Sequence, residues 1–126
     1  IIHCHGWLSA LVPLYIKKYY HDDPLYKQSK VIYSVYNDEF PESLDKNFNK
    51  KLLLEGITPE DVKILENPTY ENISRLAIDY SDAIIQGSEK INPEIQQYIQ
   101  MSKKLFLAFQ PKETYIDAYN EFYDKI

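Results

Sequence analysis

The sequence predicts an α/β domain in which a parallel sheet is flanked by helices. Short apolar segments typical of buried strands occur at 1–5, 30–36 and 83–86. Helical patterns and helix-start signals separate them, and strands joined by helical crossovers form parallel sheets. A chain of 126 residues is long enough for one domain with its own core. We therefore expect a single Rossmann-like domain over residues 1–126.

The opening stretch, IIHCHGWLSALVPLYI, predicts a short buried strand followed by a helix. Residues 1–5 form the strand, and 7–20 form the helix. Pro13 removes a backbone donor and crowds the preceding turn, so we expect a kink there. The apolar residues recur at helical spacing and define the predicted buried face: Leu8, Leu11, Val12, Tyr15 and Tyr19.

The segment KVIYSVY at 30–36 predicts a central strand, because its apolar residues fall on both alternations. Residues 37–41 leave this strand as a loop. Apolar spacing then indicates a helix that ends near Gly56. A further helix should begin at Thr58-Pro59-Glu60-Asp61, which combines a cap residue, a proline at the first helical position and two acids.

The second half continues the alternation of helix and strand. Asn67-Pro68-Thr69 opens a helix, residues 83–86 form the third strand, and Asn92-Pro93-Glu94 caps the next helix. Residues 104–109 predict a weaker fourth strand. A terminal helix over 112–126 should dock through one apolar side, formed by Tyr115, Tyr119, Phe122 and Ile126.

Composition excludes several function classes. The net charge of −5 and the single arginine, Arg75, argue against nucleic acid as a partner, because phosphate binding needs clustered Lys and Arg. The apolar stretch over 7–20 is interrupted by Pro13 and two lysines, so we expect no membrane partner. Cys4 is alone and cannot form an internal disulfide, which favours a cytoplasmic location. Ile1 reads as the inside of a strand, so the chain resembles part of something longer.

Ligands of open parallel sheets sit beyond the carboxyl ends of the strands. His5 ends the first predicted strand, and Asn37 and Gly87-Ser88 follow the next two, so all should share one edge of the sheet.

The segment His3-Cys4-His5 could form a metal site, a cysteine nucleophile or a sugar pocket, and strand geometry argues against the first two. Alternate side chains share a face, so both histidines should point one way and Cys4 the other. Besides them only His21 could serve as a histidine ligand, so we expect no metal site. Cys4 lies inside the strand and should be buried and inert. The three glycines are too far apart for a phosphate loop, and we expect no cofactor.

His5 is the strongest candidate for a functional residue. It ends the strand, precedes Gly6, and lies where free amides at the start of a helix could receive an anionic or hydroxyl-rich ligand. A structural histidine with satisfied hydrogen bonds is the alternative, and the residues alone leave both open.

The stretch IIHCHGWLSALVPLYI, followed by KVIYSVYN, resembles the bacterial glycogen and starch synthases, the retaining glycosyltransferases of family 5. The first domain of that family has a His-x-His-Asp-Trp strand end and a later Thr-x-His-Asn strand end. YSDAIIQGSEKINPEI looks like the segment that closes that domain. The resemblance is most specific in 1–37 and looser in 76–95.

The resemblance implies part of the amino-terminal half of a GT-B fold, with ADP-glucose and an α-1,4-glucan as ligands in the cleft between two domains. The second histidine of the motif lies near the transferred glucose and matches His5, which the resemblance makes the candidate catalytic residue. His5, Gly6, Trp7 and Asn37 then form the substrate-binding set.

Three departures from the family pattern stand at this edge. Gly6 replaces the Asp of the first motif, Tyr36 replaces the His of the second, and the loop continues as Asp38-Glu39-Phe40. The family's Lys-x-Gly-Gly loop would precede Ile1, and its second domain is absent from these residues. The last residues look like a terminal helix, so we expect a parent protein with the first domain only.

We expect these 126 residues alone to be inactive, because diphosphate departure needs cationic clamps that are lacking near the edge. One alternative is a non-catalytic module that binds glucan or protein, or self-associates through its uncovered surface. Another is a flavodoxin-like or response-regulator-like domain, for which only Asp38 and Glu39 stand at a strand end.

Overall fold

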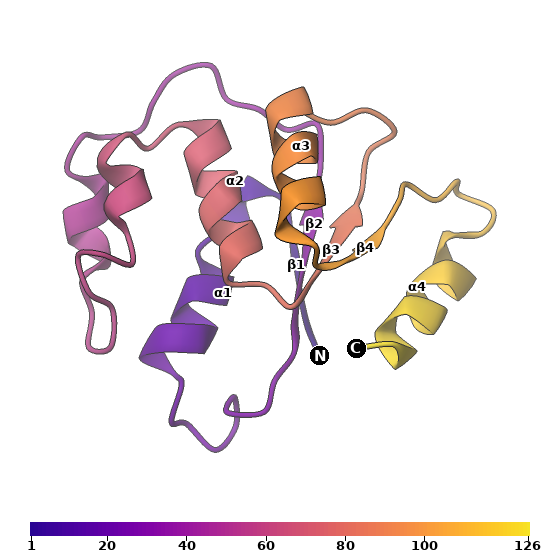
Figure 1. The fold of residues 1–126 in the computed structure, drawn as a ribbon, viewed down its shortest axis with the longest axis horizontal. Helices are drawn as coiled ribbons and strands as arrows, with labels where there is room; N and C mark the ends of the chain where they lie inside the picture. Colours follow the sequence, from indigo (N-terminus) through magenta and orange to yellow (C-terminus); the bar gives the residue numbers. More distant parts are fainter.

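A four-stranded parallel sheet forms the centre of the protein, as the sequence predicts. The structure, a computed structural model, describes residues 1–126. The strands lie in sequence order (Figure 1): β1 (Ile2–His5), β2 (Val31–Val35), β3 (Ala83–Gln86) and β4 (Leu105–Leu107). Every residue of β2 is buried, which confirms it as a central strand. The fold is therefore α/β and Rossmann-like.

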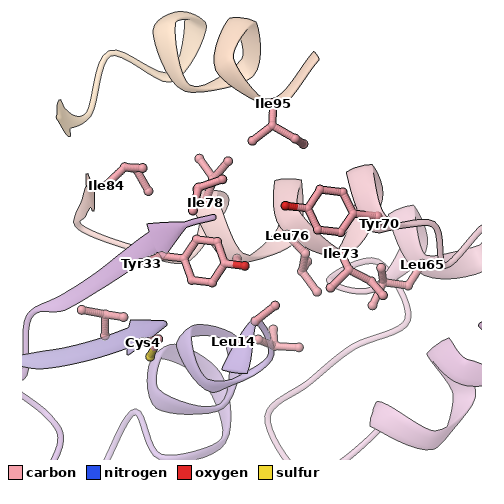
Figure 2. Packing of buried hydrophobic residues seen from close by; sticks show 14 of the residues in the cluster. Cys4, Leu14, Tyr33, Leu65, Tyr70, Ile73, Leu76, Ile78, Ile84 and Ile95 are labelled. Atoms are coloured by element: carbon pink, nitrogen blue, oxygen red, sulfur yellow. The ribbon is translucent and has the colours of Figure 1, made fainter. Parts of the chain in front are cut away.

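Three helices cover one face of the sheet. These are α1 (Val12–Leu14), α2 (Tyr70–Asp79) and α3 (Pro93–Ser102). Together with β1, β2 and β3 they bury a core cluster of 20 residues. Figure 2 shows Tyr33 pointing away from β2 among the side chains of Leu14, Leu76 and Ile78. This cluster forms most of the hydrophobic core.

The opposite face of the sheet is covered by a single helix, α4 (Tyr115–Asp124), which lies apart from α2 and α3 in Figure 1. Phe122 is 4% exposed and packs on Ile32, Ala83 and Ile85. Tyr119 and Ile126 also contact this small cluster. The predicted docking of the terminal helix is confirmed, although the helix is shorter than 112–126 and Tyr115 is exposed.

The predicted continuous helix over 7–20 is wrong. A 3-10 turn at Trp7–Ser9 precedes α1, and a π-helical turn at Tyr15–Tyr19 follows it. Pro13 is at the start of α1, where a proline loses no intrahelical hydrogen bond, so it begins the helix instead of kinking one. The changes of winding also rotate the buried face: Leu8 is 85% exposed, and the segment buries Ala10, Pro13, Leu14 and Ile16.

The two helices predicted between 48 and 66 are also wrong. This region contains 3-10 turns at Phe48–Leu52 and Lys63–Glu66. Thr58 and Asp61 exchange backbone-to-side-chain hydrogen bonds, as a helix-start signal requires. A 3-10 turn follows instead of an α-helix. Capping stabilises the first turn only, and further turns must be stabilised by other interactions.

The start signals of α2 and α3 are confirmed. Thr69 accepts a hydrogen bond from the amide of Asn72, and Asn92 accepts from the amides of Glu94 and Ile95. None of the helices has the length and apolar character needed to cross a membrane.

Candidate functional site

The carboxyl ends of β1, β2 and β3 meet at one edge of the sheet. His5 pairs with Ser34 in the register of β1 and β2, and the amide of Gly87 donates to the carbonyl of Val35 at 2.7 Å. The amide of Asn37 donates to Ser88 Oγ at 2.9 Å. The structure therefore brings His5, Asn37 and Gly87-Ser88 to a common edge, as the sequence predicts.

Gly6 makes the turn that leaves β1. Its φ of 74° and ψ of 172° lie in a region that is essentially restricted to glycine. A Cβ on residue 6 would also lie 2.7 Å from Asp38 Oδ2. The identity of residue 6 is thus fixed both by the backbone and by the carboxylate beside it.

Asp38 joins the loops that follow β1 and β2. Its Oδ2 accepts from the amide of Trp7 at 3.1 Å, and its Oδ1 accepts from the hydroxyl of Tyr70 at 2.9 Å. The expectation of a free amide after His5 is therefore wrong for Trp7. In the motif that the sequence resembles, a carboxylate stands at position 6, whereas here Asp38 supplies one from the neighbouring loop.

Trp7 lies against the loop after β2 and is partly buried. Its ring centroid is 4.6 Å from that of Phe40, and Phe40 in turn lies 5.7 Å from Tyr70 in an edge-to-face arrangement. Such aromatic contacts add to the burial energy of the rings. The indole therefore reports on the position of this loop.

His5 points to the face of the sheet opposite the large core. It is exposed, its Nδ1 lies 2.7 Å from the hydroxyl of Tyr36, and its ring stacks on His3 with centroids 4.0 Å apart. Burial raises the pKa of Tyr36, which keeps its hydroxyl protonated near neutral pH. His5 thus has one ring nitrogen held by Tyr36.

Tyr36 occupies space that only glycine at position 87 leaves free. A Cβ on Gly87 would lie 2.5 Å from Cε1 of Tyr36. Tyr36 also spans the edge from β2 to β1 through its hydrogen bond to His5. Where the resemblance implies a histidine, tyrosine therefore also places a polar group at the edge.

Cys4 points the other way, as predicted. It is 4% exposed within the large core cluster, and burial raises the pKa of its thiol. The thiolate required of a nucleophile is therefore disfavoured.

An open hollow of about 490 Å³ adjoins the edge beside Phe40 and Tyr70. His5, Gly6, Trp7 and Asn37 do not line it. Three glutamates make it acidic, and its lining comprises Glu39, Phe40, Pro41, Glu42, Ser43, Thr69, Tyr70 and Glu71.

Sequence reasoning missed the groups that hold the histidines. Ser34 Oγ lies 2.5 Å from His3 Nε2, and the hydroxyl of Tyr123 lies 2.7 Å from His3 Nδ1. The alternation of β2 places Ser34 on the same face as His3, which is a usable signal. The partnership with Tyr123 spans 120 positions, and no local pattern indicates it.

The chain is similar to known glycogen synthases. It is 30% identical over 98 residues to the glycogen synthase of Moorella thermoacetica, a stretch that covers 76% of this chain and 20% of that protein. It is 35% identical over 100 residues to the enzyme of Clostridium perfringens, with coverage of 76% and 20%. It is 33% identical over 97 residues to that of Chlorobium luteolum, with coverage of 75% and 19%.

The chain spans about a fifth of the length of the curated relatives it matches. No solved structure matches it significantly. The family description of the starch synthase catalytic domain matches residues 1–105, which include all of β1, β2 and β3 and the edge that carries His5. With this match over most of its length, the chain belongs to the starch synthase catalytic domain family.

Proposed function

We propose that this chain forms part of the site of a glucosyltransferase of the glycogen and starch synthase type. The observation that carries the proposal is the shared edge: the exposed His5 at the end of β1 lies beside the Gly6 turn, and Asn37 follows the neighbouring strand. The reaction transfers glucose from ADP-glucose to the end of an α-1,4-glucan. The bond from C1 of glucose to the diphosphate breaks, a bond from C1 to an acceptor hydroxyl oxygen forms, and ADP takes the electron pair while the hydroxyl proton is released.

His5 is the residue we propose to contact the transferred glucose. Its Nδ1 is held by Tyr36, so its Nε2 remains for a sugar hydroxyl, which can donate to or accept from an imidazole. Trp7 and Asn37 flank the glucose, and Gly6 makes the turn between His5 and Trp7.

The chain alone should bind the donor weakly and transfer no glucose. Departure of a diphosphate requires cationic groups near its oxygens. The loops at the edge carry Asp38 and Glu39, and Lys90 lies in the loop between β3 and α3. One lysine in these loops falls short of a clamp.

The test uses the fluorescence of Trp7, the only tryptophan. ADP-glucose should produce a weak but saturable change that is lost in His5→Ala and retained in His21→Ala. His21 is a matched control because it is an exposed histidine that hydrogen-bonds the carbonyl of Lys18, outside the edge. No response to ADP-glucose, or an equal response in His5→Ala, would contradict the role of His5. Incorporation of labelled glucose into glycogen by the chain alone would contradict its inactivity.

A non-catalytic module that binds glucan or protein is a second candidate, and one observation favours it. Leu105 and Phe106 of the edge strand β4 are 46% and 40% exposed. Exposed apolar surface of this kind marks sites of interaction. A fluorescence response to maltooligosaccharides, with none to ADP-glucose, would support this function over the first.

A further inference from the structure

The last helix contributes to the site although it lies outside the family match. That match ends at residue 105, whereas α4 spans Tyr115–Asp124. Phe122 anchors α4 on β2 and β3, and Tyr123 reaches the histidine face of β1. His5 stacks on His3, so the face from which both project is the one covered by α4. This helix lies apart from α2 and α3 in Figure 1.

His3 has both ring nitrogens engaged. Nδ1 lies 2.7 Å from the hydroxyl of Tyr123, and Nε2 lies 2.5 Å from Ser34 Oγ. A neutral imidazole has one N–H and one acceptor nitrogen, so the two hydroxyls must play opposite roles. A phenol is the more acidic hydroxyl and the better donor, which favours donation from Tyr123 to Nδ1 and from Nε2 to Ser34. His3 is thereby held in one orientation.

His3 also remains uncharged near neutral pH. Burial, with His5 beside it, lowers the pKa of His3 to about 4. The titratable groups that contact it are His5, Tyr119 and Tyr123, and none of them is a carboxylate that would stabilise an imidazolium. The ring beneath His5 is therefore neutral.

His5 is held from two directions. Tyr36 fixes the Nδ1 edge of its ring, and His3 supports the ring face with an interplanar angle of 24°. Removing the support would free the ring to rotate about its side-chain bonds. Adding a proton to His3 would place a positive charge against any imidazolium at His5.

We propose that Tyr123 is a positioning residue for His5: α4 uses the Tyr123 hydroxyl to fix His3, and His3 supports the ring of His5. The contact between His5 and glucose rests on the proposed function, but the arrangement of the rings does not. The helix α4, which lies beyond the family match, thus positions a residue of the glucosyl site.

The test compares Tyr123→Phe with Tyr115→Phe in the full chain. Both changes remove one hydroxyl from α4 and retain the ring, but Tyr115 is 40% exposed and its hydroxyl has no hydrogen bond. Nitrogen-15 and proton spectra of the imidazoles report the tautomer and hydrogen bonding of each histidine, and His21 is an internal reference. In Tyr123→Phe the Nδ1 signal of His3 should shift and the ring signals of His5 should move, with those of His21 constant.

Stability and ligand response separate a positioning role from a purely structural one. Tyr123→Phe should melt at a lower temperature than Tyr115→Phe, because it alone loses a hydrogen bond. At temperatures where both variants are fully folded, the affinity for ADP-glucose should fall severalfold in Tyr123→Phe and stay unchanged in Tyr115→Phe. Unchanged His5 signals in a folded Tyr123→Phe protein would overturn the proposal. If Tyr123→Phe fails to fold, Ser34→Ala tests the same support from the other nitrogen of His3, and unchanged His5 signals there would also overturn it.

The two hypotheses fail in different ways. Shifted His5 signals without any response to ADP-glucose would uphold the positioning of His5 by Tyr123 and contradict the proposed function. An equal response to ADP-glucose in wild type and Tyr123→Phe, with unmoved His5 signals, would support the proposed function and contradict the positioning role of Tyr123.

Discussion

The two faces of the sheet differ in what covers them. One face packs against three helices and contributes to a cluster of 20 buried residues, whereas the other packs against α4 and contributes to a cluster of four. The first face is almost wholly apolar. The second carries His3, His5 and Ser34, whose hydrogen bonds reach Tyr36 and Tyr123. Most of the apolar burial that stabilises the fold is thus on one face. The histidines, which are the candidate functional groups, lie on the face with less apolar burial.

The sharpest test of this difference compares one truncation on each face. Leu76→Ala opens a cavity under α2, where Leu76 is 2% exposed, and should lower the free energy of unfolding by about 2 to 5 kcal/mol. Phe122→Ala should mainly detach α4, because this helix has few other buried contacts. Urea unfolding and hydrogen exchange measure both. An equal global loss in the two variants would show that the faces are equally important for stability.

The second prediction concerns the turn at Gly6, which follows β1. Gly6→Ala should cost about 1 to 3 kcal/mol of stability, because the residue has a conformation that other residues rarely adopt. Part of this cost comes from the contact with Asp38, so the same change should cost less in an Asp38→Ala background.

Gly56→Ala is the matched control for this pair. Gly56 has a φ of 88°, and a Cβ there would lie 2.6 Å from the carbonyl of Lys18. Its cost should be equal in both backgrounds when measured by urea unfolding. A Gly6→Ala cost that is independent of Asp38 would show that backbone strain alone fixes the glycine.

A smaller effect is expected from caps on the helix-covered face. Thr69→Ala removes the side-chain acceptor at the start of α2 and should lower the free energy of unfolding by about 1 kcal/mol. Thr58→Ala removes a similar acceptor from an isolated turn and should cost less. Thermal unfolding of the two variants compares them, and a larger loss at Thr58 would indicate that the 3-10 region carries more of the stability than its packing suggests.

The smallest expected effect is a pH dependence on the α4 face. The native pKa of His3 is about 4, below its ordinary value of 6.5, so between these values the unfolded chain binds a proton that the folded chain does not. The free energy of unfolding should therefore fall as the pH drops from 6.5 towards 4. Solvent near this half-buried ring keeps the effect small. Urea unfolding at several pH values should show a shallower acid loss in His3→Gln, and an identical slope would contradict the assignment to His3.

Much of the fold could be predicted from the sequence, because strands and capped helices carry local signals. The segment 83–86 matches β3, and the alternation in β1 correctly separates Cys4 from the two histidines. The helix at 7–20 could not be predicted, because its burial follows the winding set by a proline and a π-helical turn. Leu8 fits an apolar stripe in sequence yet lies in solvent.

The candidate site was only partly predictable for a related reason. His5 and Asn37 are recognised because each stands at the carboxyl end of a strand, and parallel strands end at one edge. Asp38 and Tyr123 bind groups from distant parts of the chain. Asp38 accepts from the amide of Trp7 after β1, and Tyr123 of α4 hydrogen-bonds His3 of β1. Such partners depend on tertiary packing, which has no counterpart in local spacing.

The close fit of Tyr36 against Gly87 also constrains how this lineage diverged. A side chain at position 87 would collide with the Tyr36 ring, since a Cβ would lie 2.5 Å from it. A lineage that carried a larger residue at position 87 therefore had to lose it before or together with the acquisition of tyrosine at position 36. Positions 36 and 87 are thus coupled, and a side chain at position 87 requires a different placement of the residue at position 36.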